Sequence, residues 1–155
     1  MVKILFVCLG NICRSPMAEF VFRDYVIQHG SQKDFEIASA ATSNWEHGNP
    51  VHSGTVRILK THGLKIGGKT SRPVTSADFY HYDWIIGMDL NNVTDLEQMA
   101  PCDATATITS FLSVVPDLMT DGVPDPYYSG NFEQTYELVQ LGTVAWFEKL
   151  HLLNS

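Results

Sequence analysis

The sequence predicts one α/β domain over residues 1–155, built on a four-stranded parallel sheet with helices on both faces. Four apolar, β-branched runs each precede a segment with helical spacing, and this alternation is typical of parallel sheets. The first run, residues 2–8, is continuously apolar after Lys3. Strands of that kind are buried on both faces. A single core suits chains of about 100–200 residues, and no repeat, linker or low-complexity stretch divides this one.

Each element has its own local signal. After the strand at residues 2–8, Pro16 suits the first turn of a helix, and Gly30 is a stop signal at its end. Gly63 likewise ends a helix that contains Val56, Leu59 and Lys60. The last helix begins at Asn131, where Gln134 completes a pair typical of a capping box. The other predicted elements are strands at 35–40, 84–88 and 105–111 and a helix at 90–99.

Composition limits the functional classes. With 17 acidic and 10 basic residues the chain carries a charge of −7, which argues against nucleic acid as a partner. A single phosphate group remains possible, because local donors rather than average charge hold it. The acidic surplus predicts a weak preference against acidic peptides. No run could span a membrane, no signal peptide is evident, and three cysteines are too few for a disulfide scaffold, so we expect a cytoplasmic protein.

The segment after the first strand carries the chemistry. Cys8 is followed by Gly10, Arg14 and Ser15, so a thiol, a tight loop and a guanidinium precede the first helix. Loop amides and the helix N-terminus favour an anion at one point, either a phosphate or a thiolate. Arg14 matches two phosphate oxygens, and Ser15 can donate a hydrogen bond to the sulfur. The spacing fits neither a nucleotide P-loop nor a dinucleotide-binding turn.

Two turn-rich stretches, 42–55 and 116–131, are expected to overhang this end of the sheet. The second contains Asp125, which Pro126 holds in an extended or turn conformation. A thiolate that attacks a phosphoester needs an acid for the leaving oxygen, and Asp125 can supply it. The adjacent Tyr127 and Tyr128 can wall a pocket for an aromatic ring.

CLGNICRSP near the N-terminus and DPYY about 115 residues later make the chain resemble the low-molecular-weight protein tyrosine phosphatases over its whole length. The resemblance implies a flavodoxin-like, three-layer fold and a phosphomonoesterase that needs no cofactor and no metal. It also implies that Cys8 is the nucleophile that becomes a phosphocysteine. Arg14 then binds the phosphate, and Asp125 acts first as general acid and then as base.

The resemblance implies further roles around these three residues. Backbone amides of Leu9, Gly10, Asn11, Ile12, Cys13 and Arg14 would line the phosphate cradle, and Ser15 would stabilise the thiolate. Asn11 and Ser39 match residues that hold the loop in its strained shape. Trp45, Tyr127 and Tyr128 match the rim that grips the substrate ring. The substrate is then a phosphotyrosine protein or a small aryl phosphate, and we expect a monomer.

The sequence departs from the family at two positions. Ala38 stands where relatives often place a carboxylate, and the second departure lies in a supporting network. Lys69 falls where mammalian members carry a histidine in a hydrogen-bonded network, and Asp89 matches the acid of that network. These changes are expected to tune stability and substrate choice. The resemblance also implies a reversible Cys8–Cys13 disulfide under peroxide, while Cys102 is expected to be an ordinary semi-buried thiol.

Alternative functions share the same cysteine loop. Bacterial arginine phosphatases carry threonine where this chain has Ile12, and an apolar Ile12 favours phosphotyrosine because it cannot hydrogen-bond a guanidinium. Thioredoxin-coupled arsenate reductases need two further cysteines, whereas only Cys102 lies outside the loop. A phosphate-binding protein without turnover is the rival from another class. The six histidines show no metal-ligand spacing.

Overall fold

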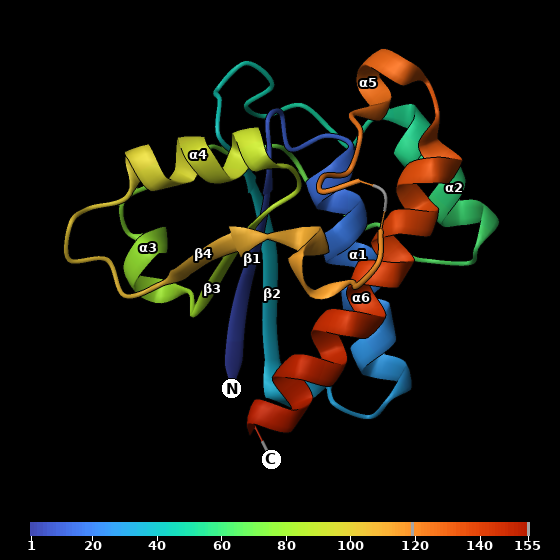
Figure 1. The fold of residues 1–155 in the computed structure, drawn as a ribbon. Coiled ribbons are helices and arrows are strands. Elements are labelled where there is room, and N and C mark those ends of the chain that lie inside the picture. Colours follow the sequence, from blue (N-terminus) through green and yellow to red (C-terminus); the bar gives the residue numbers. More distant parts are fainter. Residues whose placement is uncertain (119, 155) are drawn as a thin grey trace.

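The computed structural model describes residues 1–118 and 120–154, and its centre is a parallel four-stranded sheet in the order β2-β1-β3-β4 (Figure 1). β1 is the inner strand that pairs with both β2 and β3, so Ile4 lies opposite Ile37 on one side and Trp84 on the other. The strands are β1 (Val2–Cys8), β2 (Phe35–Ala41), β3 (Trp84–Gly87) and β4 (Thr107–Ser110).

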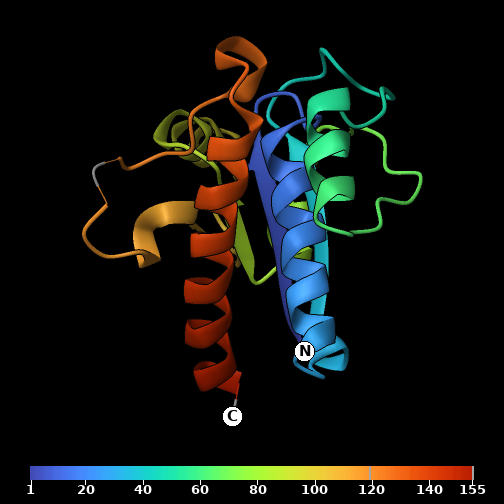
Figure 2. The ribbon, with the colours of Figure 1, turned by 90° about the vertical axis from the view of Figure 1, so that its right-hand side faces the viewer.

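Helices cover both faces of the sheet, which confirms the predicted fold class. α1, α2 and α6 lie together on one face, and α3 and α4 lie on the other (Figures 1 and 2). No helix among the described residues is long and apolar enough to cross a membrane. The helices are α1 (Arg14–Gln28), α2 (Ser53–Thr61), α3 (Asp78–His81), α4 (Leu90–Met99), α5 (Pro126–Ser129) and α6 (Phe132–Asn154), with short 3-10 helices at Gln32–Asp34 and Phe111–Val114.

The alternation of side chains along β1 divides the core into two clusters. Ile4, Phe6 and Cys8 join the larger cluster beneath α1 and α6, whereas Leu5 and Val7 join the smaller one beneath α3 and α4. All five are at most 2% exposed. β1 is therefore buried on both faces, as its continuous apolar run predicts.

Two short helices were not expected from the sequence. α3 directly precedes β3. α5 lies inside the stretch 116–131, which the sequence predicts to be a loop. Asp125 is the N-cap of α5, and its side chain accepts a hydrogen bond from the Tyr127 amide at 3.0 Å. Gly130 ends the helix with φ 74°, a conformation that favours glycine.

The carboxyl end of β1 lies beneath the two turn-rich segments. The loop after β2 and α5 both stand above this edge of the sheet (Figures 1 and 2). α2 is fixed beside it by a close approach at Gly54, because a Cβ at that position would lie 2.4 Å from the Phe132 ring. Parallel sheets place ligand sites at this edge, so the fold brings the predicted site residues to one place.

Candidate active site

Cys8 ends β1, and its sulfur is surrounded by hydrogen-bond donors. The Ser15 hydroxyl lies 3.1 Å from Cys8 Sγ, and the amides of Asn11 and Ser15 point at the sulfur from 3.2 and 3.5 Å. Cys8 is only 2% exposed, and α1 begins just beyond the loop at Arg14. Amides and a helix N-terminus that converge on one sulfur hold negative charge there.

Asn11 holds the loop in a strained shape. Its φ of 56° lies in the left-handed region, which a residue with a side chain rarely adopts. The buried side chain donates to Ser15 Oγ at 2.8 Å and to Ser39 Oγ at 2.9 Å, and it accepts from the Arg72 amide at 3.2 Å. Ser71 adds a hydrogen bond to Gly10 O at 2.8 Å. These contacts fix the backbone that faces the pocket.

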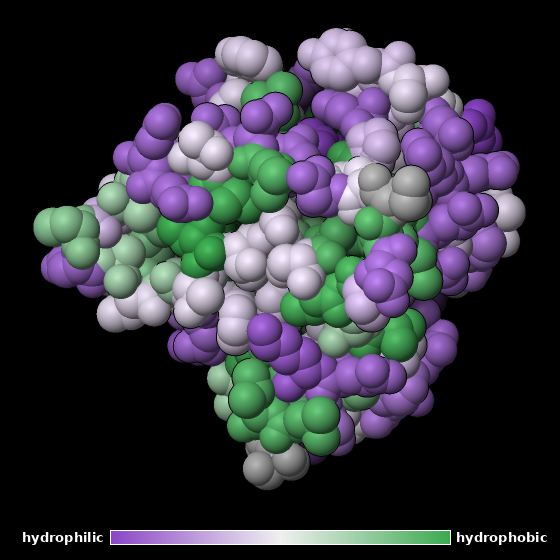
Figure 3. Space-filling view, in the orientation of Figure 1, coloured by the Kyte–Doolittle hydropathy of each residue, from purple (hydrophilic) through white to green (hydrophobic). Residues whose placement is uncertain are grey.

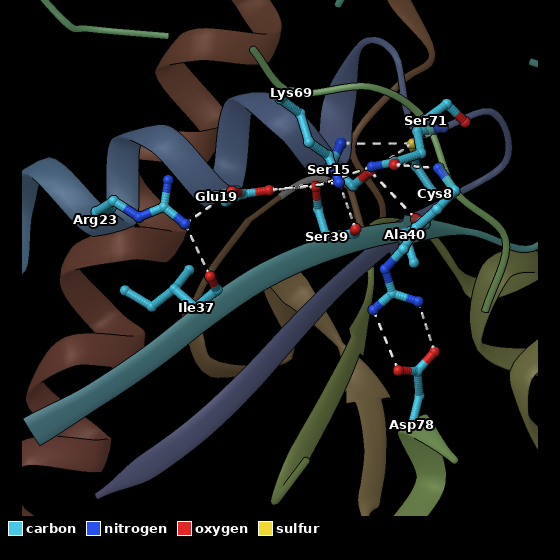
Figure 4. Close-up of polar contacts among 12 residues, drawn as sticks. Cys8, Ser15, Glu19, Arg23, Ile37, Ser39, Ala40, Lys69, Ser71 and Asp78 are labelled. Atoms are coloured by element: carbon cyan, nitrogen blue, oxygen red, sulfur yellow. Dashed lines mark hydrogen bonds and ion pairs between the residues drawn. The ribbon is translucent and has the colours of Figure 1, made fainter. Parts of the chain in front are cut away.

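A charged cluster supports Ser39 from behind the loop (Figure 4). The Ser39 hydroxyl donates to Glu19 Oε1 at 2.5 Å, and Arg23 binds the other oxygen of Glu19 at 2.8 Å. Lys69 Nζ donates to Ser39 O at 2.8 Å and lies 3.9 Å from Glu19 Oε1. Burial lowers the pKa of Lys69 below its usual 10.5, while the Glu19 carboxylate opposes that shift.

Lys69 and Asp89, which the resemblance assigns to one network, lie in two different sets of contacts. Lys69 belongs to the Glu19 cluster, whereas Asp89 accepts a hydrogen bond from Arg14 Nη1 at 2.6 Å. Asp89 is also the N-cap of α4, where it accepts from the Asn92 amide at 2.8 Å. The carboxylate that faces Lys69 is Glu19, and Asp89 orients the arginine instead.

Arg14 is a buried cation with three acceptors. Besides Asp89, its guanidinium donates to Val123 O at 3.1 Å and to Asp125 Oδ2 at 3.4 Å. Burial alone would lower the pKa of Arg14, but the charge of Cys8 and the two carboxylates raise it above its usual value. Arg14 therefore stays charged and oriented beside both Cys8 and Asp125.

A pocket of about 160 Å³ opens above this constellation. Trp45, Tyr127 and Tyr128 form its rim with exposed fractions of 73%, 57% and 75%. The rings of Tyr127 and Tyr128 lie 5.3 Å apart, roughly edge to face. The lining residues are Cys8, Leu9, Gly10, Ile12, Cys13, Arg14, Trp45, Glu46, Asp125, Tyr127 and Tyr128.

The structure thus brings together nearly all the residues singled out in the sequence. Asn11, Ser15 and Ser39 lie beneath the loop rather than in the pocket wall. Glu46 lines the pocket but was not anticipated.

A comparison with protein families matches residues 3–153 to the model described as "Low molecular weight phosphotyrosine protein phosphatase". The chain belongs to this family. A curated relative, the low molecular weight protein-tyrosine-phosphatase YfkJ of Bacillus subtilis, is 44% identical over 92% of this chain and 91% of its own length. The predictions of the family, of a cysteine-dependent phosphatase and of the protein-tyrosine-phosphatase function are confirmed.

Solved structures agree with the fold of this phosphatase. The crystal structure of YfkJ superposes with a TM-score of 0.96 at 40% identity and covers 100% of this chain and 98% of that one. A low molecular weight protein tyrosine phosphatase from Streptococcus pyogenes gives 0.86 at 47% identity, covering 97% and 93%. A structure titled as a Drosophila arginine phosphatase gives 0.90 at 31% identity, covering 96% and 98%.

The two other thiols of the phosphatase differ in environment. Cys13 is buried beside the pocket, where burial, followed by the charges of Cys8 and Asp125, raises the pKa of its thiol to about 12. Cys102 was expected to be semi-buried, and this is wrong: it is exposed in the turn after α4. The turn runs along the surface, where the neighbouring Asp103 and Thr105 are exposed as well.

Proposed function

We propose that this phosphatase hydrolyses phosphotyrosine in proteins, and small aryl phosphates, through a phosphocysteine on Cys8. The observation that carries the proposal is the convergence of Cys8, Arg14 and Asp125 on one pocket with an aromatic rim. The phosphate would occupy the loop, held by its amides and by Arg14, and the ring would stand between Trp45 and the two tyrosines.

In the first step the Cys8 thiolate attacks phosphorus. An S–P bond forms, the P–O bond to the tyrosine breaks, and Asp125 gives a proton to the leaving phenolic oxygen. Arg14 and the loop amides stabilise charge on the three equatorial oxygens. The hydrogen bond from the Tyr127 amide leaves the other oxygen of Asp125 facing the pocket.

In the second step Asp125, now a carboxylate, takes a proton from a water molecule. The water oxygen bonds to phosphorus, the S–P bond breaks, and inorganic phosphate and the Cys8 thiolate are released. The Ser15 hydroxyl, 3.1 Å from the sulfur, stabilises the thiolate as leaving group.

The decisive experiment measures phenyl phosphate hydrolysis by the wild type, Cys8→Ser and Asp125→Ala. We expect no turnover with Cys8→Ser. We expect Asp125→Ala to lower kcat by about 100-fold or more with a smaller change in KM, because the acid acts mainly in the transition state. An inactive wild type would show that the protein binds phosphate without turnover. A fully active Cys8→Ser variant would show that Cys8 is not the nucleophile.

Phosphoarginine is the second candidate substrate, because a structural relative is titled an arginine phosphatase. Ile12 lines the pocket of this chain and offers no acceptor for a guanidinium, whereas a phenyl ring needs none. We therefore expect kcat/KM for phosphotyrosine to exceed that for phosphoarginine. The reverse order, measured on the same preparation, would assign the enzyme to phosphoarginine.

Peroxide regulation through Cys13 is a further part of the proposal. Peroxide would oxidise the Cys8 thiolate to a sulfenic acid. The Cys13 thiol would then displace water from that sulfur and form a disulfide. The high pKa of Cys13 keeps this thiol protonated in the active enzyme. Oxidation of Cys8 removes one of the negative charges that raise the pKa of Cys13. Disulfide formation by Cys13 is therefore favoured only after Cys8 has been oxidised.

We also propose that the chain acts as one domain over residues 1–155, as a monomer in the cytoplasm, with neither a nucleic acid nor a membrane as partner. All three cysteines are free, which suits a reducing compartment. Light scattering on the purified protein tests the monomer directly, and a concentration-dependent dimer would overturn it.

A further inference from the structure

The basic residues of this acidic protein are concentrated in one segment. Residues 47–77 contain five of the ten lysines and arginines and no aspartate or glutamate. The segment carries a charge of +5, so the other 124 residues carry −12. It includes α2 and the loop that follows, and hydrophilic side chains predominate on that right-hand edge of the surface (Figure 3).

Three of these five cations have no carboxylate partner among residues 1–118 and 120–154. Lys69 and Arg72 pair with Glu19 and Asp78, which lie outside the segment. Arg57, Lys60 and Lys65 are exposed and form no ion pair within the described chain. Their charge faces solvent and is free to meet a ligand.

The unpaired cations line a groove that starts at the active site. Ile12 lines both the phosphate pocket and the groove. The groove then runs along α2 past Val51, Val56 and Lys60, and it continues between Leu64, Lys65 and Ile66. We call this feature, lined by Ile12, Val51, Val56, Arg57, Lys60 and Lys65, the α2 groove. Its floor is apolar, and its edges are basic.

The residues around the pocket decide on which side an acidic peptide can leave it. His52 lines the groove next to the pocket rim, with its ring 5.1 Å from Phe132 and 6.0 Å from Tyr127 on the rim. Glu46 lies in the pocket wall beside Trp45 and near Gly10, so an acidic ligand meets repulsion there. An acidic chain that leaves the pocket is therefore favoured along α2 and disfavoured over Trp45.

We propose that the α2 groove binds the acidic flank of a phosphotyrosine peptide, with carboxylates at Arg57, Lys60 and Lys65 and an apolar side chain on Val51 and Val56. The inference rests on the proposed function, because the phosphotyrosine anchors the peptide at Cys8. An acidic peptide fits better than a membrane or a polynucleotide. The apolar floor suits a side chain, and the charge of −12 elsewhere repels an extended anionic surface. The substrate preference is opposite to that predicted from net charge alone.

The test compares Lys60→Glu with Lys33→Glu, an equal charge reversal in the 3-10 helix before β2, near the amino end of the sheet. Substrates are phenyl phosphate, a neutral phosphotyrosine peptide, and two peptides with three glutamates before or after the phosphotyrosine. In the wild type we expect kcat/KM for one acidic peptide to exceed that for the neutral peptide by about five- to ten-fold at low salt, and by less at high salt. We expect Lys60→Glu to abolish this advantage by raising KM for the acidic peptide. Lys33→Glu should keep the wild-type advantage, and both variants should hydrolyse phenyl phosphate at the wild-type rate.

Each other result counts against the groove or against the enzyme, and the two are distinguishable. Equal kcat/KM for acidic and neutral peptides, or equal losses in both variants, overturns the groove while phosphatase activity stands. If peptides do not discriminate but anionic vesicles bind the wild type and not Lys60→Glu, the basic edge serves a membrane, which also overturns the proposal. A wild type that hydrolyses neither peptides nor phenyl phosphate refutes the proposed function itself.

Discussion

The carboxylate of Glu19 is the buried charge on which the support of the phosphate loop depends, and Glu19→Gln tests that dependence. Glu19 is 5% exposed and accepts hydrogen bonds from Ser39 and Arg23, with Lys69 3.9 Å away. Glutamine keeps the shape but turns one acceptor oxygen into a donor. If the amide faces Arg23, that arginine loses its acceptor; if it faces Ser39, the amide donates to the hydroxyl and the hydroxyl proton loses its acceptor. In both orientations the hydrogen bonds to a charged oxygen are lost, and the neighbouring lysine loses its anionic partner.

The loss in the free energy of unfolding depends on how deeply each hydrogen-bond partner of Glu19 is buried. A hydrogen bond to a charged group is worth about 1.5–3 kcal/mol, and Ser39 is fully buried. The side chain of Arg23 is 40% exposed, so solvent screening reduces its pair with Glu19 to below about 1 kcal/mol. We expect Glu19→Gln to lower the free energy of unfolding by about 2–3 kcal/mol and Arg23→Gln by less than about 1 kcal/mol.

Urea unfolding at pH 7, with the slope m checked for constancy, measures both variants. Glu97→Gln, on the exposed side of α4, is the matched control and should stay within about 0.5 kcal/mol of the wild type. Because Ser39 also holds Asn11, Glu19→Gln should lower kcat for phenyl phosphate more than it changes KM. If Glu19→Gln is as stable as Glu97→Gln, the carboxylate of Glu19 does not support the loop. If Arg23→Gln loses as much free energy of unfolding as Glu19→Gln, the buried Ser39 contact is not the dominant one.

Three further predictions concern pH, packing and oxidation. Burial lowers the pKa of Lys69 in the folded state, so the unfolded chain binds this proton more tightly and the stability from this group rises as pH approaches 10.5. The stability of Lys69→Met relative to wild type should fall between pH 8 and 10, and a constant difference in urea unfolding would contradict this. Gly142→Ala should cost about 1–3 kcal/mol in thermal unfolding, because its Cβ would lie 2.1 Å from the Phe111 ring; an unchanged Tm would count against that close approach. Peroxide inactivation should be reversed by thiol in the wild type but largely permanent in Cys13→Ser, and equal recovery would remove Cys13 from the mechanism.

The sequence predicts the sheet and the long helices because their signals are local. The apolar run lies within β1 itself, and the glycine stops lie two residues beyond the ends of α1 and α2. α5 also had its signals, with Asp125 as N-cap, proline in the first turn and Gly130 at the end. A four-residue helix has no apolar periodicity, so those signals predict only a turn.

In the active site, too, some residues can be predicted from local spacing, and others become apparent only in the folded chain. Cys8, Arg14 and Ser15 lie within eight residues of one another and are found from their spacing. Glu19 and Ser71 act through partners 20 and 61 residues away, and a single glutamate on a helix predicts only a solvated face. The pairing of Lys69 with Glu19 rather than Asp89 likewise depends on how β2 and the loop before Arg72 pack together. Contacts of this kind exist only once the chain is folded.

The hydrogen bonds of Arg14 have a consequence for the small anions of the surrounding solution. The Arg14 guanidinium donates to Asp89, Val123 O and Asp125. Both N–H groups of Nη1 are taken up by Asp89 and Val123 O, so an incoming anion meets the guanidinium on the side of Nη2, beside Asp125. Chloride gains little there, since it brings one charge and cannot span the loop amides. A tetrahedral phosphate reaches the guanidinium and the amides together, so the geometry of the loop favours phosphate over a monovalent ion.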